Sequence, residues 1–64
     1  MIKRTITPGG SVEIACSTQA EFIEQRETLT AVFGGEPDEC LQWEVIYPRP
    51  DGTEVALWWA EDGL

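Results

Sequence analysis

Residues 41–59 read LQWEVIYPRPDGTEVALWW, and this stretch decides the fold. Apolar side chains recur at every second position in residues 41–47 and again in residues 55–59, which is the period of a β-strand with one buried face. Between the two runs, Asp51-Gly52 supplies the positive φ that a tight turn requires. The stretch therefore predicts a β-hairpin.

The segment before this hairpin has the pattern of an amphipathic helix. Thr18 and Glu21 have the spacing of a capping box. Good helix formers continue as far as Phe33, where Gly34-Gly35 provide the stop. The apolar stripe consists of Phe22, Leu29 and Phe33, flanked by Ile23 and Val32. Arg26 falls within this stripe, so we expect its stem to cover the core and its guanidinium to reach a carboxylate at the edge; the alternative is a functional arginine.

The N-terminal residues alternate less clearly. Residues 2–7 have a weak period of two, Pro8-Gly9-Gly10 interrupts it, and residues 12–16 resume it. This indicates either a hairpin or one strand preceded by an extended arm. The whole pattern predicts a single α+β domain over residues 1–64, with a small antiparallel sheet of three to four strands. One amphipathic helix packs on one face of that sheet, in the order β(β)αββ.

The charge balance is unusual for so short a chain. Twelve Asp and Glu residues against four Lys and Arg give a formal net charge of -8, and histidine is absent. Such a field attracts basic surfaces and repels nucleic acid and anionic membranes, so we expect no direct nucleic-acid or membrane binding. The alternative interpretation is that the acidity simply keeps a small protein soluble.

Few residues in this sequence can carry catalysis or hold a metal. The commonest general base is missing with histidine, and both Cys16 and Cys40 occupy positions where an apolar residue would fit the pattern. Two thiols fall short of the four ligands of a structural zinc site. The acidic loop 36–39 lacks the alternating oxygen ligands of an EF-hand. We therefore expect no enzyme, no cofactor and no dedicated metal site.

No apolar run approaches the ~20 residues of a membrane span, and Pro8-Gly9-Gly10 interrupts the region where a secretory segment would continue. We therefore expect a cytoplasmic protein with reduced thiols. The sequence leaves open whether Cys16 and Cys40 form a disulfide.

Carboxylates gather in three places that are candidates for binding a partner. They are Glu21, Glu24 and Glu27 on the predicted helix, Glu36, Asp38 and Glu39 just after it, and Asp51 and Glu54 around the hairpin turn. Like charges at the helical spacing destabilise a helix by a few tenths of a kcal/mol per pair. Either a solvated face tolerates this cost, or the negative field is itself functional. A compact acidic body could then occupy a Lys/Arg-lined DNA channel as a decoy.

The two adjacent tryptophans point to opposite faces of their strand, because side chains alternate along it. Trp59 shares a side with Val55 and Leu57, which leaves Trp58 on the other side, near Ile46. Trp58 is therefore a candidate exposed anchor for a partner. The alternatives are that it lies flat on the outer sheet or that the N-terminal arm covers it.

The chain as a whole resembles the small acidic anti-CRISPR proteins of phages and mobile elements, and most of all those that inhibit type I-C CRISPR-Cas systems. The resemblance runs from Met1-Ile2-Lys3-Arg4, through the acidic helix Glu21–Phe33, to Trp58-Trp59 and Glu61-Asp62-Gly63-Leu64. It lies in size, charge and the overall run of residues, since the family has no shared motif.

The resemblance implies an inhibitor that binds Cas subunits of a type I surveillance complex (Cascade) in the bacterial host cytosol. Several inhibitors of this kind act as DNA mimics that block target recognition. The acidic residues named above come from the charge pattern and not from the family. The alternative is another host-takeover or regulatory module that binds its partner through the exposed aromatic sheet face. The sequence leaves open the contacted subunit, competition with DNA and the oligomeric state.

Overall fold

The computed structural model describes residues 1–60, apart from the side chains of Glu39 and Cys40. In chain order the elements are β1 (Ile2–Ile6), β2 (Val12–Cys16), α1 (Gln19–Phe33), β3 (Glu39–Leu41), β4 (Glu44–Pro48) and β5 (Glu54–Trp59). The sequence after β5 also predicts a short polar tail over residues 60–64, of which residues 61–64 lie outside the described range. Within that range, no helix combines the length and the apolar character needed to traverse a bilayer.

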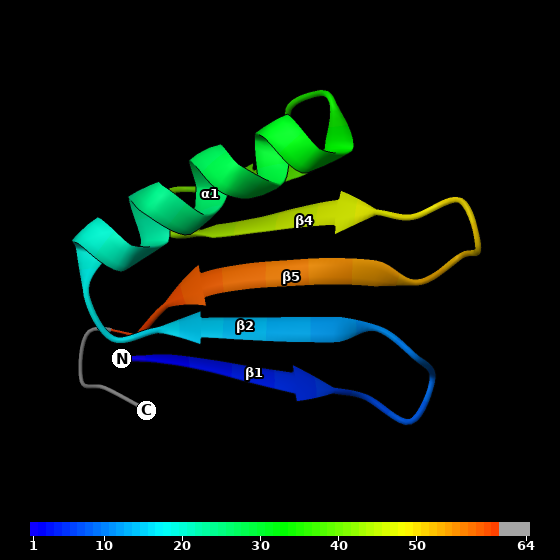
Figure 1. The fold of residues 1–64 in the computed structure, drawn as a ribbon, viewed down its shortest axis with the longest axis horizontal. Helices are drawn as coiled ribbons and strands as arrows, with labels where there is room; N and C mark the ends of the chain where they lie inside the picture. Colours follow the sequence, from blue (N-terminus) through cyan, green and yellow to red (C-terminus); the bar gives the residue numbers. More distant parts are fainter. Residues whose placement is uncertain (61–64) are drawn as a thin grey trace.

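The described strands form one sheet in the order β1-β2-β5-β4-β3. Neighbouring strands run antiparallel, except for β2 and β5, which are parallel. The helix α1 packs against β2, β4 and β5. Figure 1 shows α1 on the β4 side of the sheet and β1 at the far edge. We call the face toward α1 the inner face and the opposite one the outer face.

The α+β class, the single helix on one face and the hairpin at the Asp51-Gly52 turn are confirmed. The first strand of this hairpin is shorter than the predicted run 41–47, because Gln42 and Trp43 form the turn between β3 and β4. The sheet itself differs from the expected antiparallel sheet of three to four strands, because it is mixed and includes the short β3 as a fifth strand. The physical reason is the path of the chain. After β2 the chain reverses through α1, β3 and β4, so β5 runs in the same direction as β2 and enters the sheet beside it (Figure 1).

The N-terminal segment is a strand and not a loose arm. β1 pairs with β2 from Ile2 opposite Cys16 to Ile6 opposite Val12, so the hairpin alternative is the right one. The turn between them is closed by hydrogen bonds from the Thr7 amide to the Ser11 carbonyl at 2.8 Å and from the Gly10 amide to the Thr7 carbonyl at 2.9 Å. This pairing makes β1 the edge strand on that side of the sheet.

The core lies between α1 and the inner face. It consists of Ile14, Cys16, Phe22, Val45, Tyr47, Val55 and Leu57. Trp43 closes one end of it, with its ring 5.5 Å from that of Phe22 and 5.0 Å from that of Trp59 in edge-to-face contacts. Cys16 is a buried free thiol, and burial raises its pKa, which keeps it in the unreactive neutral form.

A buried tyrosine fixes α1 on the sheet. The Tyr47 hydroxyl donates to the carbonyl of Arg26 at 3.1 Å and is 2.8 Å from the Thr30 hydroxyl, so its polar atom is satisfied inside the structure. Arg26 itself is half-buried, and its Nη2 atom lies 3.2 Å from a carboxylate oxygen of Glu36. The expectation that the guanidinium of Arg26 reaches a carboxylate is therefore confirmed.

Candidate functional site

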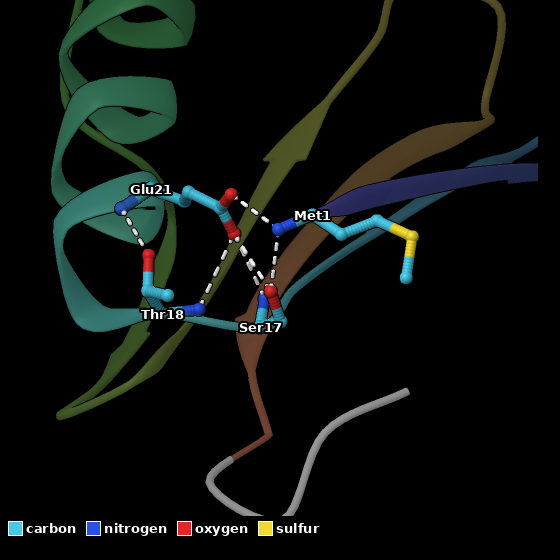
Figure 2. A network of polar contacts seen from close by, with 4 residues as sticks. All are labelled: Met1, Ser17, Thr18 and Glu21. Atoms are coloured by element: carbon cyan, nitrogen blue, oxygen red, sulfur yellow. Dashed lines mark hydrogen bonds and ion pairs between the residues drawn. The ribbon is translucent and has the colours of Figure 1, made fainter.

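Glu21 belongs to the internal structure of the protein and not to a docking surface. Figure 2 shows its carboxylate at the centre of a network that joins the start of α1 to the start of the chain. The Glu21 amide donates to the Thr18 side chain at 3.1 Å, and the Thr18 amide donates back to the Glu21 carboxylate at 3.2 Å. The predicted capping box is thus confirmed. The same carboxylate accepts hydrogen bonds from the Ser17 amide and from the ammonium group of Met1.

These donors hold Glu21 in its charged form. The ammonium of Met1 contributes most, followed by the Ser17 donors, and together they lower the pKa of Glu21 to about 2. Ammonium and carboxylate meet because the β1–β2 register places Ile2 opposite Cys16, beside the first turn of α1. A carboxylate engaged in this way has little capacity left for a partner, so Glu21 drops out of the candidate docking residues.

Asp51 also has a structural role. Its Oδ1 atom accepts from the amide of Thr53 at 2.9 Å and from the Thr53 hydroxyl, and these donors lower the pKa of Asp51. Gly52 takes the positive φ of 89° that the turn requires. Asp51 therefore shapes the β4–β5 turn, whereas its neighbour Glu54 has an exposed side chain with no hydrogen bond or ion pair to residues 1–60.

Glu24 and Glu27 project from the solvent side of α1, and we call this pair the α1 acidic face. Both side chains are exposed, and neither forms a hydrogen bond or an ion pair within the described part of the chain. Three residues of helix separate them by about 4.5 Å along the axis. Their charge is therefore unneutralised and available to a partner.

Glu36 and Asp38 follow α1 in the loop before β3. Glu36 is 74% exposed, but Arg26 partly neutralises it. With Glu27 and Arg26 it borders a groove of about 350 Å³ between α1 and the turn before β4. The other walls of this groove include Phe22, Ile23 and Trp43. Asp38 is exposed, and its amide donates to the Ile46 carbonyl at 3.1 Å. The side chain of Glu39 lies outside the described structure.

Trp58 lies on the outer face, as expected from the alternation. Its indole is half-buried, and the strand register places it between Ala15 of β2 and Glu44 of β4. The N-terminal segment does not cover it, because that segment is the edge strand β1. Trp58 borders an open hollow of about 490 Å³, which Trp43 and Trp59 also line.

Two carboxylates of this hollow were missed in reasoning from the sequence. Glu13 and Glu44 border it together with Trp58 and Ala56, and both are exposed. Alternation alone places each of them on the side of its strand away from the core. Only the strand order, with β5 between β2 and β4, shows that they flank Trp58 from opposite sides.

The expected carboxylates therefore do not form one continuous stripe. Glu21 and Asp51 form hydrogen bonds within the protein, and Glu36 forms an ion pair with Arg26. The carboxylates without such a partner lie on the α1 acidic face, in the following loop, at the turn and on the outer face. Of the four basic residues, Lys3 and Arg4 are exposed on β1, Arg26 lies on α1, and Arg49 joins the two turns by a hydrogen bond to the Gly10 carbonyl.

The described residues offer no group of three or more His, Cys, Asp or Glu side chains with the arrangement of a metal site. Comparisons with protein-family models, with curated proteins and with solved structures found no match to this chain. The function must therefore be argued from the chemistry of its two exposed surfaces, the α1 acidic face and the outer face.

Proposed function

We propose that this protein is a non-catalytic anti-CRISPR inhibitor that binds a type I surveillance complex (Cascade) through its acidic α1 side and blocks recognition of target DNA. The family and the type I-C subtype come from the resemblance in sequence. The docking residues come from the geometry: Glu24 and Glu27 at the centre, with Glu36 and Asp38 beyond the helix. The site of action is the bacterial host cytosol, where the complex resides.

The observation that carries this proposal is the unneutralised state of Glu24 and Glu27. Both carboxylates are exposed on a helix that Tyr47, Thr30 and the capping box hold rigidly on the sheet. A rigid helix fixes the positions from which these charges project, and the charges steer a basic partner at long range. A DNA-binding channel lined with Lys and Arg presents the complementary charge.

Competition with DNA tests this function directly. Purified type I-C surveillance complex is immobilised, and binding of the protein is measured before and after the complex is loaded with target duplex. We expect binding to the empty complex, strong inhibition of that binding by preloaded DNA, and weakening as salt rises from about 50 to 300 mM because exposed charges are screened. An affinity that changes with neither preloaded DNA nor salt would refute DNA mimicry.

A second candidate function is an interaction module that uses the outer face. The observation in its favour is the hollow beside Trp58, which no described helix or strand covers. Substitution of Trp58 by Leu would abolish partner binding by this module, whereas charge reversal of Glu24 and Glu27 would leave that binding intact. One pair of variants therefore distinguishes the two candidate functions.

A further inference from the structure

The hollow on the outer face has a specific construction. Small side chains stand next to Trp58 on its own strand and on β2, where Ala56 is half-buried and Ala15 is 7% exposed. Ala56 borders the hollow and leaves space beside the indole that a larger residue would fill, whereas Ala15 is covered and does not border the hollow. The result is an open hollow lined by Ala56, by the carboxylates Glu13 and Glu44, and by Trp58 together with Trp43 and Trp59.

The two carboxylates stand on either side of the Trp58 indole. Glu44 lies directly opposite Trp58 in the antiparallel β4–β5 pair, where opposed Cβ atoms are about 5 Å apart. Glu13 lies on β2, opposite Ala56 and one diagonal step from Trp58. Neither carboxylate has a hydrogen bond or an ion pair to residues 1–60, and Lys3, on the same face, is separated from Trp58 by Ala15.

We propose that this hollow is a binding site for an arginine side chain of a partner protein, with the guanidinium stacked on Trp58 between Glu13 and Glu44. A planar guanidinium is the cation that both stacks on an indole and donates in-plane hydrogen bonds to carboxylates. The small side chain of Ala56 leaves the plane room to lie against the ring. The site is independent of the proposed inhibition, because it shares no residue with the α1 acidic face.

The negative charge of the outer face also argues against two other occupants, a second copy of the chain and an anionic membrane. Two copies of the chain stacked through their outer faces would bring Glu13, Glu44 and Glu54 of each copy together, which opposes self-association. An anionic membrane would be repelled by the same carboxylates. A basic protein segment is the occupant whose charge fits.

The test uses the blocked peptide acetyl-Gly-Arg-Gly-amide as the probe, titrated at low salt into the ¹⁵N-labelled protein and followed by two-dimensional NMR. We expect saturable shifts of the Trp58 indole N–H and of the amides of Glu13, Glu44 and Ala56. The same peptide with lysine should bind more weakly, and the peptide with citrulline, which keeps the shape without the charge, should not bind. Trp58→Leu should raise the dissociation constant about fivefold, the size of an exposed cation–π contact.

Glu44→Gln gives a second variant that keeps the indole and almost the shape of the side chain, and it should also weaken binding of the arginine peptide. Glu24→Gln on α1 is the matched control and should bind as the unmodified protein does. The inference is overturned if the shifts centre on α1, if citrulline binds as well as arginine, or if Trp58→Leu and Glu44→Gln leave the affinity unchanged. A dimer in sedimentation at the same concentration, lost with Trp58→Leu, would overturn it in favour of a second copy.

Discussion

The two faces of the sheet are built from alternate residues of the same strands, but they differ in burial. On the inner face, Val45, Tyr47 and Leu57 are at most 1% exposed and pack beneath α1. On the outer face, the intervening residues Glu44, Ile46 and Trp58 are exposed or half-buried. Residues that stabilise the core and residues proposed to contact a partner therefore alternate along each strand, so substitutions at neighbouring positions should differ in their effect on stability.

The largest difference is expected between a core leucine and a half-buried isoleucine. Leu57 is fully buried on the central strand β5, so Leu57→Ala should lower the free energy of unfolding by about 3 kcal/mol through lost burial and the resulting cavity. Ile46→Ala, on the outer face of β4, should cost less than half of that because solvent already reaches the site. Urea denaturation followed by circular dichroism measures both. Equal losses would mean that the outer face is as buried as the inner one.

The adjacent tryptophans give a sharper version of the same comparison. Both tryptophans border the hollow, but Trp59 also packs on Trp43 and against the core, whereas Trp58 lies on the outer face of the sheet. Trp59→Leu should therefore lower the free energy of unfolding by about 2 kcal/mol, and Trp58→Leu by less than about 1 kcal/mol. Thermal unfolding of the two variants side by side tests this order. The reverse order would show that Trp58 is a structural residue and not an anchor.

A smaller effect, visible through its pH dependence, is expected at Glu21. The folded state lowers the pKa of this carboxyl from 4.5 to about 2, so its contribution to stability is fully present above about pH 4.5 and is lost as the pH falls toward 2. Glu21→Gln keeps an acceptor for the cap but loses the ion pair with Met1. The difference in stability between the unmodified protein and the Glu21→Gln variant should therefore shrink on acidification. Glu24→Gln, on the α1 acidic face, is the control and should differ little from the unmodified protein at any pH.

Local features of this fold could be predicted from short patterns. The capping box of Thr18 and Glu21, the helix end at Gly34 with φ 76°, and the turn at Gly52 were all predicted and are confirmed. Each depends on a few adjacent residues whose chemistry admits few conformations. The burial of Tyr47 and the outward position of Trp58 followed from alternation in the same way.

Features that depend on contacts between distant segments could not be predicted from these patterns. Alternation does not distinguish parallel from antiparallel pairing, so the parallel β2–β5 contact was missed, and with it the position of Glu13 and Glu44 around Trp58. The ion pair between the Glu21 carboxylate and the Met1 ammonium was missed for the same reason, since the β1–β2 register brings together two groups that are 20 residues apart in the sequence. The resemblance to anti-CRISPR proteins and the identity of the partner stay predictions.

The most direct measurement is the dissociation constant for purified type I-C surveillance complex of two charge-matched variants, one on α1 and one on the outer face. Glu24→Lys/Glu27→Lys should weaken binding by about tenfold or more, because reversed charges repel the basic channel. Glu13→Lys/Glu44→Lys changes the net charge equally and should weaken binding by less than about threefold through long-range steering alone. Equal losses from both variants, or none from the α1 variant, would contradict docking through the α1 acidic face.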